Sequence, residues 1–270
     1  MKKLLLSLLI LVLGISLCAC GQSILPNDDI ESILDVEENT EKSETTTQTE
    51  NSKEETDNVQ LFETGEALTY TETKEKIELG NISVEYPSLK INDTDIQIDK
   101  INETIENTIN EILKNTKSSI LEDEGINTYN GFVSYEVEMA TDKIISIVFK
   151  GLISRKDGVY PNNIFFAINV NPKTGELIKN NDIVDATTDN LCDIFEKEKC
   201  YFISDVHKEY FSEIPKEELL GYFENIDVYT KGLLMNNASF YFADDCVYIV
   251  LPTIHSLGDI AKVRIPYSNF

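Results

Sequence analysis

Tryptophan is missing from this chain, and its 270 residues include only two histidines, seven prolines and five cysteines. Several catalytic and nucleotide-binding motifs are missing as well. There is no His-Glu-x-x-His, no Gly-x-Ser-x-Gly, no phosphate-binding glycine-rich loop and no Cys-x-x-Cys. These absences argue against a zinc protease, an α/β-hydrolase, a P-loop protein and a thioredoxin-like redox protein. We therefore expect no catalytic residue, no metal site and no cofactor.

Basic residues are scarce. Lys and Arg number 23 against 48 Asp and Glu, which gives a net charge of −25. Residues 61–270 alone hold 36 acidic and 19 basic residues, a net of −17. Such a surface repels nucleic acid and anionic lipid headgroups. It would attract a cationic partner, although solubility alone accounts for most charges of this kind.

The N-terminus reads as an export signal. Lys2 and Lys3 precede an apolar run, Leu4 to Leu17, that is too short to cross a bilayer, which takes roughly 20 apolar residues. The run ends in Leu17-Cys18-Ala19-Cys20-Gly21, which resembles the lipobox of bacterial lipoproteins. The resemblance implies a signal peptide over residues 1–20, diacylglycerol on Cys20, and anchoring to the outer face of the bacterial cell membrane. The alternative is an ordinary signal peptide with an incidental cysteine pair.

Three further cysteines are present, Cys192, Cys200 and Cys246. Export permits a disulfide, but an odd number leaves at least one thiol free or paired between chains. Cys192 and Cys200 would lie about 12 Å apart along one continuous helix, so they can pair only if the chain bends between them. We favour the reading that all three are small buried apolar residues.

Residues 21–60 predict a disordered acidic tether. They carry 12 acidic residues against Lys42 and Lys53, and positions 37–50 hold no apolar side chain. Such a segment cannot bury enough apolar surface to offset its ordering entropy, and its like charges extend it.

Period-two and period-3.6 patterns predict the first half of the folded region. Strands are expected over 68–72 and 77–86, with Tyr86-Pro87 ending the second. A hairpin is expected over 133–149, turning at 140–143, with Met139 on the same face as Val133, and a loop over 151–160 comes after it. Between these strands, a helix is indicated by apolar residues at steps of three and four, with Thr94 and Gln97 as a capping box. The apolar stripe comprises Ile98, Ile101, Ile105, Ile109, Ile112 and Leu113.

In the second half, residues 164–170 predict a strand that closes at the turn Asn171–Gly175. Residues 182–223 read as helical, and the end reads as a β-meander over 238–242, 246–251 and 262–266. Strands and helices do not alternate strictly, so we expect an α+β fold of antiparallel sheets with packed helices. We place two small subdomains, at 61–160 and 161–270.

Several short motifs resemble one bacterial envelope module. The first half carries Ile82-Ser83-Val84-Glu85-Tyr86-Pro87, Ile101-Asn102, Ser134-Tyr135-Glu136-Val137 and Lys150-Gly151. The second half carries Val159-Tyr160-Pro161-Asn162-Asn163, the strand Phe165 to Asn169, Lys173-Thr174-Gly175-Glu176-Leu177 and Val263-Arg264-Ile265-Pro266-Tyr267. The module resembles the extracytoplasmic, lysozyme-binding domain of RsiV-type anti-sigma factors. It is also similar to the N-terminal module of PdaC-type peptidoglycan deacetylases and to many uncharacterised lipoproteins.

The resemblance implies a binding fold over residues 65–270, not either named activity. The family often has a small residue and a histidine before Pro-Asn, where this chain has Val159 and Tyr160. No cytoplasmic anti-sigma segment is expected before the signal peptide, and no deacetylase domain after Phe270.

Isolated polar residues supply weak catalytic candidates. His207 or His255 could act as a base for Cys200 or Cys246, but a surface histidine and a loop histidine are the simpler reading. Asp244-Asp245 and residues 122–124 most simply face water. Acid pairs for glycan cleavage remain open, since the two carboxylates need not be close in sequence.

We therefore expect a non-catalytic binding module of the cell envelope. Its ligand would be a cationic, lysozyme-like protein or cell-wall glycan. The alternatives are a small envelope hydrolase acting on peptidoglycan or glycan through carboxylates, and a purely structural assembly partner. The sequence does not identify the ligand-binding residues or the oligomeric state.

Overall fold

The computed structural model describes residues 65–120, 125–179, 193, 195, 198–224, 232–234 and 238–269. The chain divides into two compact units, Met1–Asn51 and Ser52–Phe270, and every described residue belongs to the second. In the described part, no helix combines the length and the apolar character needed to cross a membrane. The predicted signal peptide, with Cys20, and the whole of the predicted tether, residues 21–60, lie outside the described residues.

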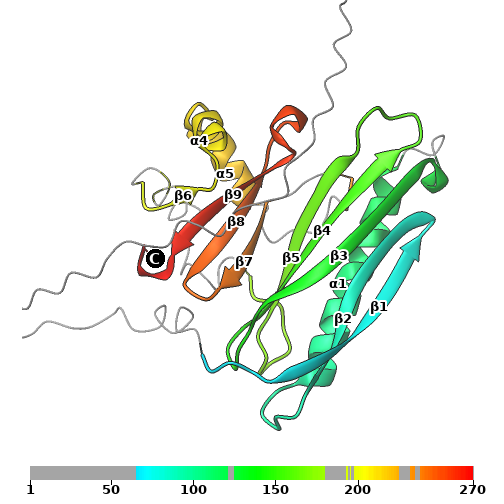
Figure 1. Cartoon of the computed structure of the whole chain (residues 1–270), viewed down its shortest axis with the longest axis vertical. Helices are drawn as coiled ribbons and strands as arrows, with labels where there is room; N and C mark the ends of the chain where they lie inside the picture. The colour runs from blue at the N-terminus through cyan, green and yellow to red at the C-terminus, as the bar shows by residue number, and fades with distance from the viewer. Residues whose placement is uncertain are drawn as a thin grey trace, which may run out of the picture. The chain divides into compact units, whose positions relative to one another are not determined.

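The first sheet has five strands in the order of the chain (Figure 1). Neighbouring strands run antiparallel except for β2 and β3, which are parallel over four residue pairs. The strands are β1 Tyr70–Leu79, β2 Asn81–Ile91, β3 Tyr129–Ala140, β4 Ile145–Arg155 and β5 Asn162–Val170. The predicted first strand pair is therefore a hairpin, but its turn lies at Gly80 instead of at residues 73–76.

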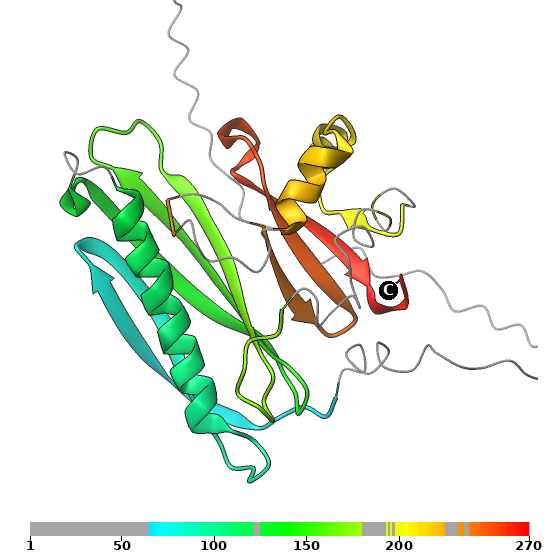
Figure 2. The same cartoon turned by 180° about the vertical axis from the view of Figure 1, so that it is seen from behind.

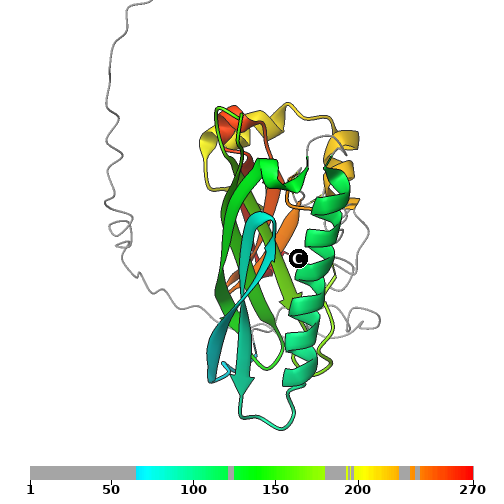
Figure 3. The ribbon, with the colours of Figure 1, turned by 90° about the vertical axis from the view of Figure 1, so that its right-hand side faces the viewer.

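Helix α1, Ile98–Ser119, lies along one face of this sheet (Figures 2 and 3). The predicted stripe is confirmed as its buried face, except that Ile98 is only partly buried. The predicted capping box is wrong, because Gln97 is the N-cap and no side chain caps the helix. Several strand residues pack against the stripe, among them Ile82, Val84, Val133, Ile147, Phe149 and Phe166.

Strand β2 continues past Pro87 to Ile91, so the predicted end at Tyr86-Pro87 is wrong. Pairing with β3 stops at Val84, and beyond it one edge of β2 has no strand neighbour among the described residues. Asn102 of α1 covers that edge. It accepts a hydrogen bond from the Leu89 N–H (2.8 Å) and donates one to the Leu89 carbonyl (3.0 Å). Residues two apart direct their N–H groups to the same edge, so Pro87 faces the side where no strand needs a donor.

The hairpin of β3 and β4 is confirmed, with two corrections. A register shift between Val137 and Met139 moves Met139 into a different core cluster from Val133, so the shared face predicted for them is wrong. The loop predicted from residue 151 begins only after Arg155, because Gly151 lies inside β4. A Cβ there would meet the Phe132 carbonyl oxygen and lie 2.7 Å from Val133 Cα, and only glycine permits this close approach.

The second sheet has four strands in the order β6-β9-β8-β7 (Figure 1). They are β6 Tyr201–Phe202, β7 Ser239–Ala243, β8 Cys246–Pro252 and β9 Ile260–Pro266, and the helices α4 Asp205–Ser212 and α5 Lys216–Glu224 precede the last three. The predicted meander is confirmed. The continuous helical reading of 182–223 is wrong at Tyr201–Phe202, because these residues pair with β9 instead.

The two sheets meet where β5 lies beside β7. Asn169 donates from its side chain to the Phe240 carbonyl (2.8 Å), and Ser239 accepts from the Ala167 N–H (3.0 Å). These strands confirm the α+β fold with mainly antiparallel sheets. The two subdomains remain a prediction, but a boundary at residue 160 would separate β4 from β5, whereas the sheets divide after Val170.

Candidate functional site

Two loops from different sheets meet at one end of the folded unit (top of Figure 1). One joins β4 to β5 over residues 156–161, and the other joins β8 to β9 over residues 253–259. The β4–β5 loop is a tight turn, in which the Gly158 N–H bonds to the Arg155 carbonyl (2.9 Å). The β8–β9 loop contains a short 3₁₀ turn, His255–Leu257.

Asp259 holds the two loops together. Its carboxylate accepts hydrogen bonds from the Asn163 N–H (2.8 Å) and from the Asn163 side-chain amide (3.2 Å). Its other oxygen accepts from His255 Nδ1 at 2.7 Å. Asp259 is 5% exposed and has φ +68°, a left-handed conformation that Asp tolerates better than most residues. A buried carboxylate with these partners fixes the β8–β9 loop against the start of β5.

His255 is thereby held in one orientation beside Tyr160. A carboxylate oxygen accepts, so Nδ1 carries the proton and Nε2 is the acceptor of the neutral ring. The His255 side chain is 47% exposed, and its ring centroid lies 6.0 Å from that of Tyr160. Helix α4 supports the same loop, because His207 Nε2 lies 2.9 Å from the Leu257 carbonyl oxygen.

Exposed apolar side chains gather around this pair. Phe132 and Leu152 face each other across β3 and β4, and Leu152 is in turn opposite Asn163 of β5. We call the set Phe132, Leu152, Val159, Tyr160, Ile254 and His255 the loop-end surface. The exposure of its five apolar members runs from 49% at Leu152 to 82% at Val159. Apolar side chains gathered at this exposure, beside rigid loops, are typical of a recognition surface.

Chemically, the His255–Asp259 pair presents an oriented imidazole at the protein surface. A histidine oriented by a buried carboxylate is half of the arrangement used in nucleophilic catalysis. The other half is a nucleophile, and among the described residues no hydroxyl or thiol is hydrogen-bonded to the His255 ring.

The chain is similar to solved structures, among them two DUF3298 family proteins. A crystal structure of a DUF3298 family protein from Pseudomonas aeruginosa PAO1 is 10% identical, covers 77% of this chain and 94% of that chain, and has a TM-score of 0.43. A member of the same family from Bacteroides fragilis NCTC 9343 is 14% identical, covers 76% and 92%, and has a TM-score of 0.42. These structural neighbours are DUF3298 family proteins, a domain of unknown function. No protein-family profile and no curated protein matches the sequence.

The two candidate nucleophiles, Cys200 and Cys246, are not hydrogen-bonded to either histidine in the described part of the chain. Cys200 and Cys246 are free thiols, the first half-buried and the second buried. Burial raises the pKa of Cys200 to about 11, and burial with the Asp245 carboxylate raises the pKa of Cys246 to about 11. Both thiols are therefore poor nucleophiles at neutral pH. Cys192 lies outside the described residues, as does the acidic run 122–124.

The remaining acidic candidates are ion-paired or turned to water. Asp244 and Asp245 are exposed in the β7–β8 turn, and Asp245 pairs with Arg264. Elsewhere, Asp142 lines an open cavity of about 290 Å³ with Glu66 and Asp93. The Glu66 N–H and Lys173 hold the pKa of Asp142 below its usual value, which is the wrong direction for a general acid. No group of three or more potential metal ligands occurs in the described part of the chain.

The sequence patterns indicate part of this site but not all of it. His255 and the motif containing Tyr160 and Asn163 were singled out in the sequence, whereas Asp259 was not. Asn163 and Asp259 are 96 positions apart, and no local pattern predicts that they meet.

Proposed function

We propose that this chain is a non-catalytic, lipid-anchored module of the bacterial envelope that binds a protein through the loop-end surface. The observation that carries the proposal is the exposed apolar set beside the loop that Asp259 fixes to β5. Tyrosine is enriched among residues that dominate binding energy, and Tyr160 is 71% exposed beside the fixed His255.

The charge of the folded region favours a cationic partner. Residues 61–270 have a net charge of −17, and a field of that sign raises the association rate of positive proteins. A lysozyme-like protein is the first candidate, since the sequence motifs resemble a lysozyme-binding module. Cell-wall glycan is the other ligand within this proposal.

The experiment measures lysozyme binding to chain 21–270, which contains the whole compact unit Ser52–Phe270. Tyr160→Ala should weaken binding at least tenfold, while Tyr201→Ala should leave it unchanged. Tyr201 is a matched control, because it is 57% exposed and lies on β6, away from both loops. Cytochrome c, a protein of similar positive charge, should bind weakly and lose that binding as salt rises.

Equal weak binding of lysozyme and cytochrome c would reduce the acidic surface to a solubility feature. Binding to insoluble peptidoglycan that depends on Tyr160, without lysozyme binding, would favour the glycan ligand.

A hydrolase is the second candidate, supported by the His255–Asp259 pair and by the acid-lined cavity near Asp142. It predicts release of soluble glycan from peptidoglycan by chain 21–270. Turnover abolished by Asp259→Asn would replace the binding proposal with this one.

A further inference from the structure

One face of the second sheet carries a row of aromatic and cationic side chains. Arg264 of β9 lies opposite Tyr248 of β8 on one side and Tyr201 of β6 on the other, and these three therefore share a face. Tyr248 in turn lies opposite Tyr241 of β7. Lys262, two positions before Arg264 on β9, projects from the same face. We call Tyr201, Tyr248, Lys262 and Arg264 the tyrosine–cation face.

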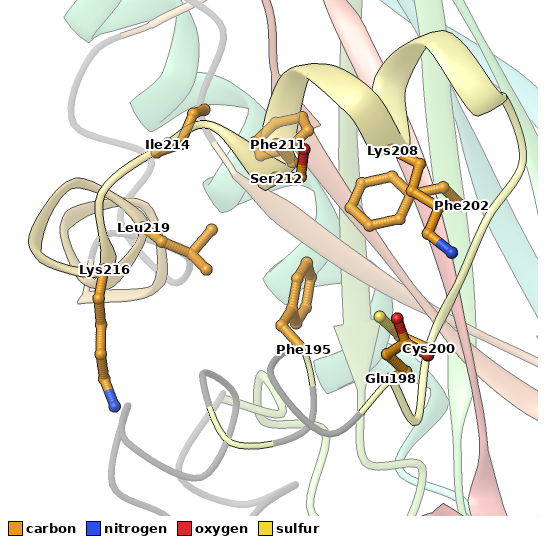
Figure 4. A pocket seen from close by; sticks show the side chains of 10 residues that line it. All are labelled: Phe195, Glu198, Cys200, Phe202, Lys208, Phe211, Ser212, Ile214, Lys216 and Leu219. Carbon is orange, nitrogen blue, oxygen red and sulfur yellow. The ribbon is translucent and has the colours of Figure 1, made fainter.

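The opposite face of this sheet is covered by helices. Phe202 and Val263 alternate with the members of the row and belong to a core that includes Phe211 of α4 and Leu219 of α5. Phe202 also lines a cavity of about 390 Å³ beside these helices (Figure 4). The tyrosine–cation face therefore points away from the helices and from this cavity.

Exposure rises along the row from the junction of the two sheets to the outer strand. Tyr241 is buried against Phe165 of the first sheet, Tyr248 is half-buried, and Tyr201 is 57% exposed. One side of the Tyr248 ring is stacked on Tyr241 with centroids 4.8 Å apart, so its other side is turned towards β9. Tyr248 and Tyr201 are two strand spacings apart, roughly 9–10 Å, which is about the advance of two sugars along an extended β-linked glycan.

Lys262 supplies charged donors that the protein does not use. Its ammonium lies over the rings of Phe165 and Tyr241, 5.2 and 5.6 Å from their centroids. Within the described residues it has no ion pair and no side-chain hydrogen bond, and burial, followed by the charge of Lys150, lowers its pKa. A charged N–H donor forms its strongest hydrogen bonds with carbonyl and carboxylate oxygens. The acetamido group of an N-acetylated sugar offers such a carbonyl.

We propose that the tyrosine–cation face binds a linear, β-linked glycan of N-acetylated sugars. One sugar would lie against Tyr248 and a second against Tyr201, because aromatic rings offer apolar surface to the apolar face of a sugar. Lys262 would donate to an acetamido carbonyl oxygen. The site shares no residue with the loop-end surface, so either proposal can fail without the other.

The test titrates chitohexaose, chitobiose and cellohexaose into chain 21–270 by calorimetry. Chitohexaose should bind at least tenfold more tightly than chitobiose, because a disaccharide is too short to reach both tyrosines. Cellohexaose has the same length without acetamido groups and should bind at least fivefold more weakly than chitohexaose. Lys262→Met keeps the stem over the rings and should abolish this difference between the two hexasaccharides.

The exposed position of Tyr201 allows it to be substituted without disturbing the core. Tyr201→Ala should weaken chitohexaose at least tenfold, whereas Tyr201→Phe, which keeps the ring, should weaken it at most threefold. Tyr160→Ala, at an exposed tyrosine of the loop-end surface, is the matched control and should leave chitohexaose binding unchanged.

A second measurement uses the unsubstituted chain. Saturating chitohexaose should slow the nitration of Tyr201 by tetranitromethane at least fivefold and leave that of Tyr160 unchanged, read by peptide mass spectrometry. Chitohexaose that binds no better than chitobiose, or equally well to the parent chain and to Tyr201→Ala, would overturn the proposal. Equal affinity of the parent chain for chitohexaose and cellohexaose would overturn the role assigned to Lys262 and the acetamido group.

Discussion

At the residue scale, Asp259 combines three energetically unfavourable features that are rarely found together in one residue. It is buried, it is an acid, and it has a left-handed backbone. Each cost is offset locally: Asn163 and His255 donate to its two oxygens, and aspartate tolerates a positive φ. Backbone strain and a buried charge at one position are a frequent mark of a functional site.

We expect Asp259→Ala to lower the free energy of unfolding by about 2–4 kcal/mol, because alanine loses the charged hydrogen bonds and strains the left-handed backbone. Asp259→Asn keeps an acceptor oxygen and tolerates the backbone, so its loss should be about 1–2 kcal/mol. Asp244→Ala, in the exposed β7–β8 turn, should stay within about 0.5 kcal/mol of the parent. Urea unfolding of chain 21–270 measures all three. Equal stability of the Asp259→Ala and Asp244→Ala variants would contradict the role of Asp259.

The raised pKa of Cys200 predicts how the rate of its alkylation depends on pH. Its folded pKa of about 11 is raised mainly by burial, so the neutral thiol is favoured below that pH. About one thiol in a thousand is then ionised at pH 8, against roughly a quarter for a free cysteine of pKa 8.5. The rate of Cys200 alkylation should rise about tenfold per pH unit from 8 to 10. In urea at pH 8 it should be about 100-fold faster or more. Folded-state reactivity at pH 8 equal to that in urea would refute the raised pKa.

At the element scale, several strands depend on features that a strand pattern does not contain. Strand β2 reaches Ile91 because β1 pairs with it as far as that residue, and Asn102, on a helix, bonds Leu89 on the other edge, where β3 has diverged. Strand β4 passes Phe132 and Val133 closely because Gly151 has no side chain.

Alanine substitutions at Gly151 and at Gly221, made separately and compared, test this close approach. Gly151→Ala places a Cβ against backbone atoms of β3, which cannot move aside, so we expect a loss of about 1–3 kcal/mol in unfolding free energy. Gly221 lies in α5, where a Cβ would meet nothing within 4 Å. Gly221→Ala should therefore stabilise by about 0.5–1 kcal/mol, because alanine has the higher helix propensity. A thermal melt of each variant gives the sign, and a neutral Gly151→Ala would contradict the geometry.

The sequence predicted the elements whose own periodicity creates a buried face. The α1 stripe and the β7–β9 meander are of this kind, since the spacing of the apolar residues in each is visible without knowing which element it packs against. Tyr201–Phe202 was misread as helix because a two-residue strand shows no period and is defined by β9 alone. Met139 was misplaced because one extra residue at a bulge inverts the facing of the residues beyond it.

The candidate site was partly predictable for the same reason. Tyr160 and His255 stand out as residue types, but their proximity depends on a contact between two sheets. The role of Asp259 can be recognised only once the structure places Asn163 beside it. A cavity of about 390 Å³ beside α4 and α5 is not predictable from the sequence either, since its lining includes residues of β6, α4 and α5 and the sequence predicts one helical stretch there.

At the scale of the whole molecule, the acidic charge of the domain and the proposed lipid anchor have opposite effects at the membrane surface. An anionic domain next to anionic headgroups is repelled, so under the proposal it is the lipid on Cys20 that would hold the chain at the membrane. The loop-end surface would then remain open to partners outside the membrane. This arrangement depends on Cys20 being the lipidated cysteine.

Cys20→Ala should move the full-length chain from the membrane fraction to the soluble exported fraction of a bacterial host. Two acyl chains give stable anchoring, and their loss leaves an acidic chain with no affinity for headgroups. Cys18→Ala is the matched control: position 18 accepts small residues in the lipobox-like motif, so this variant should stay in the membrane fraction. Globomycin, which blocks the lipoprotein signal peptidase, should leave residues 1–19 attached to Cys20 of the unsubstituted chain, seen as a larger mass. A Cys20→Ala chain that stays fully in the membrane fraction would show that another feature holds it there, and an unchanged mass under globomycin would point to an ordinary signal peptide.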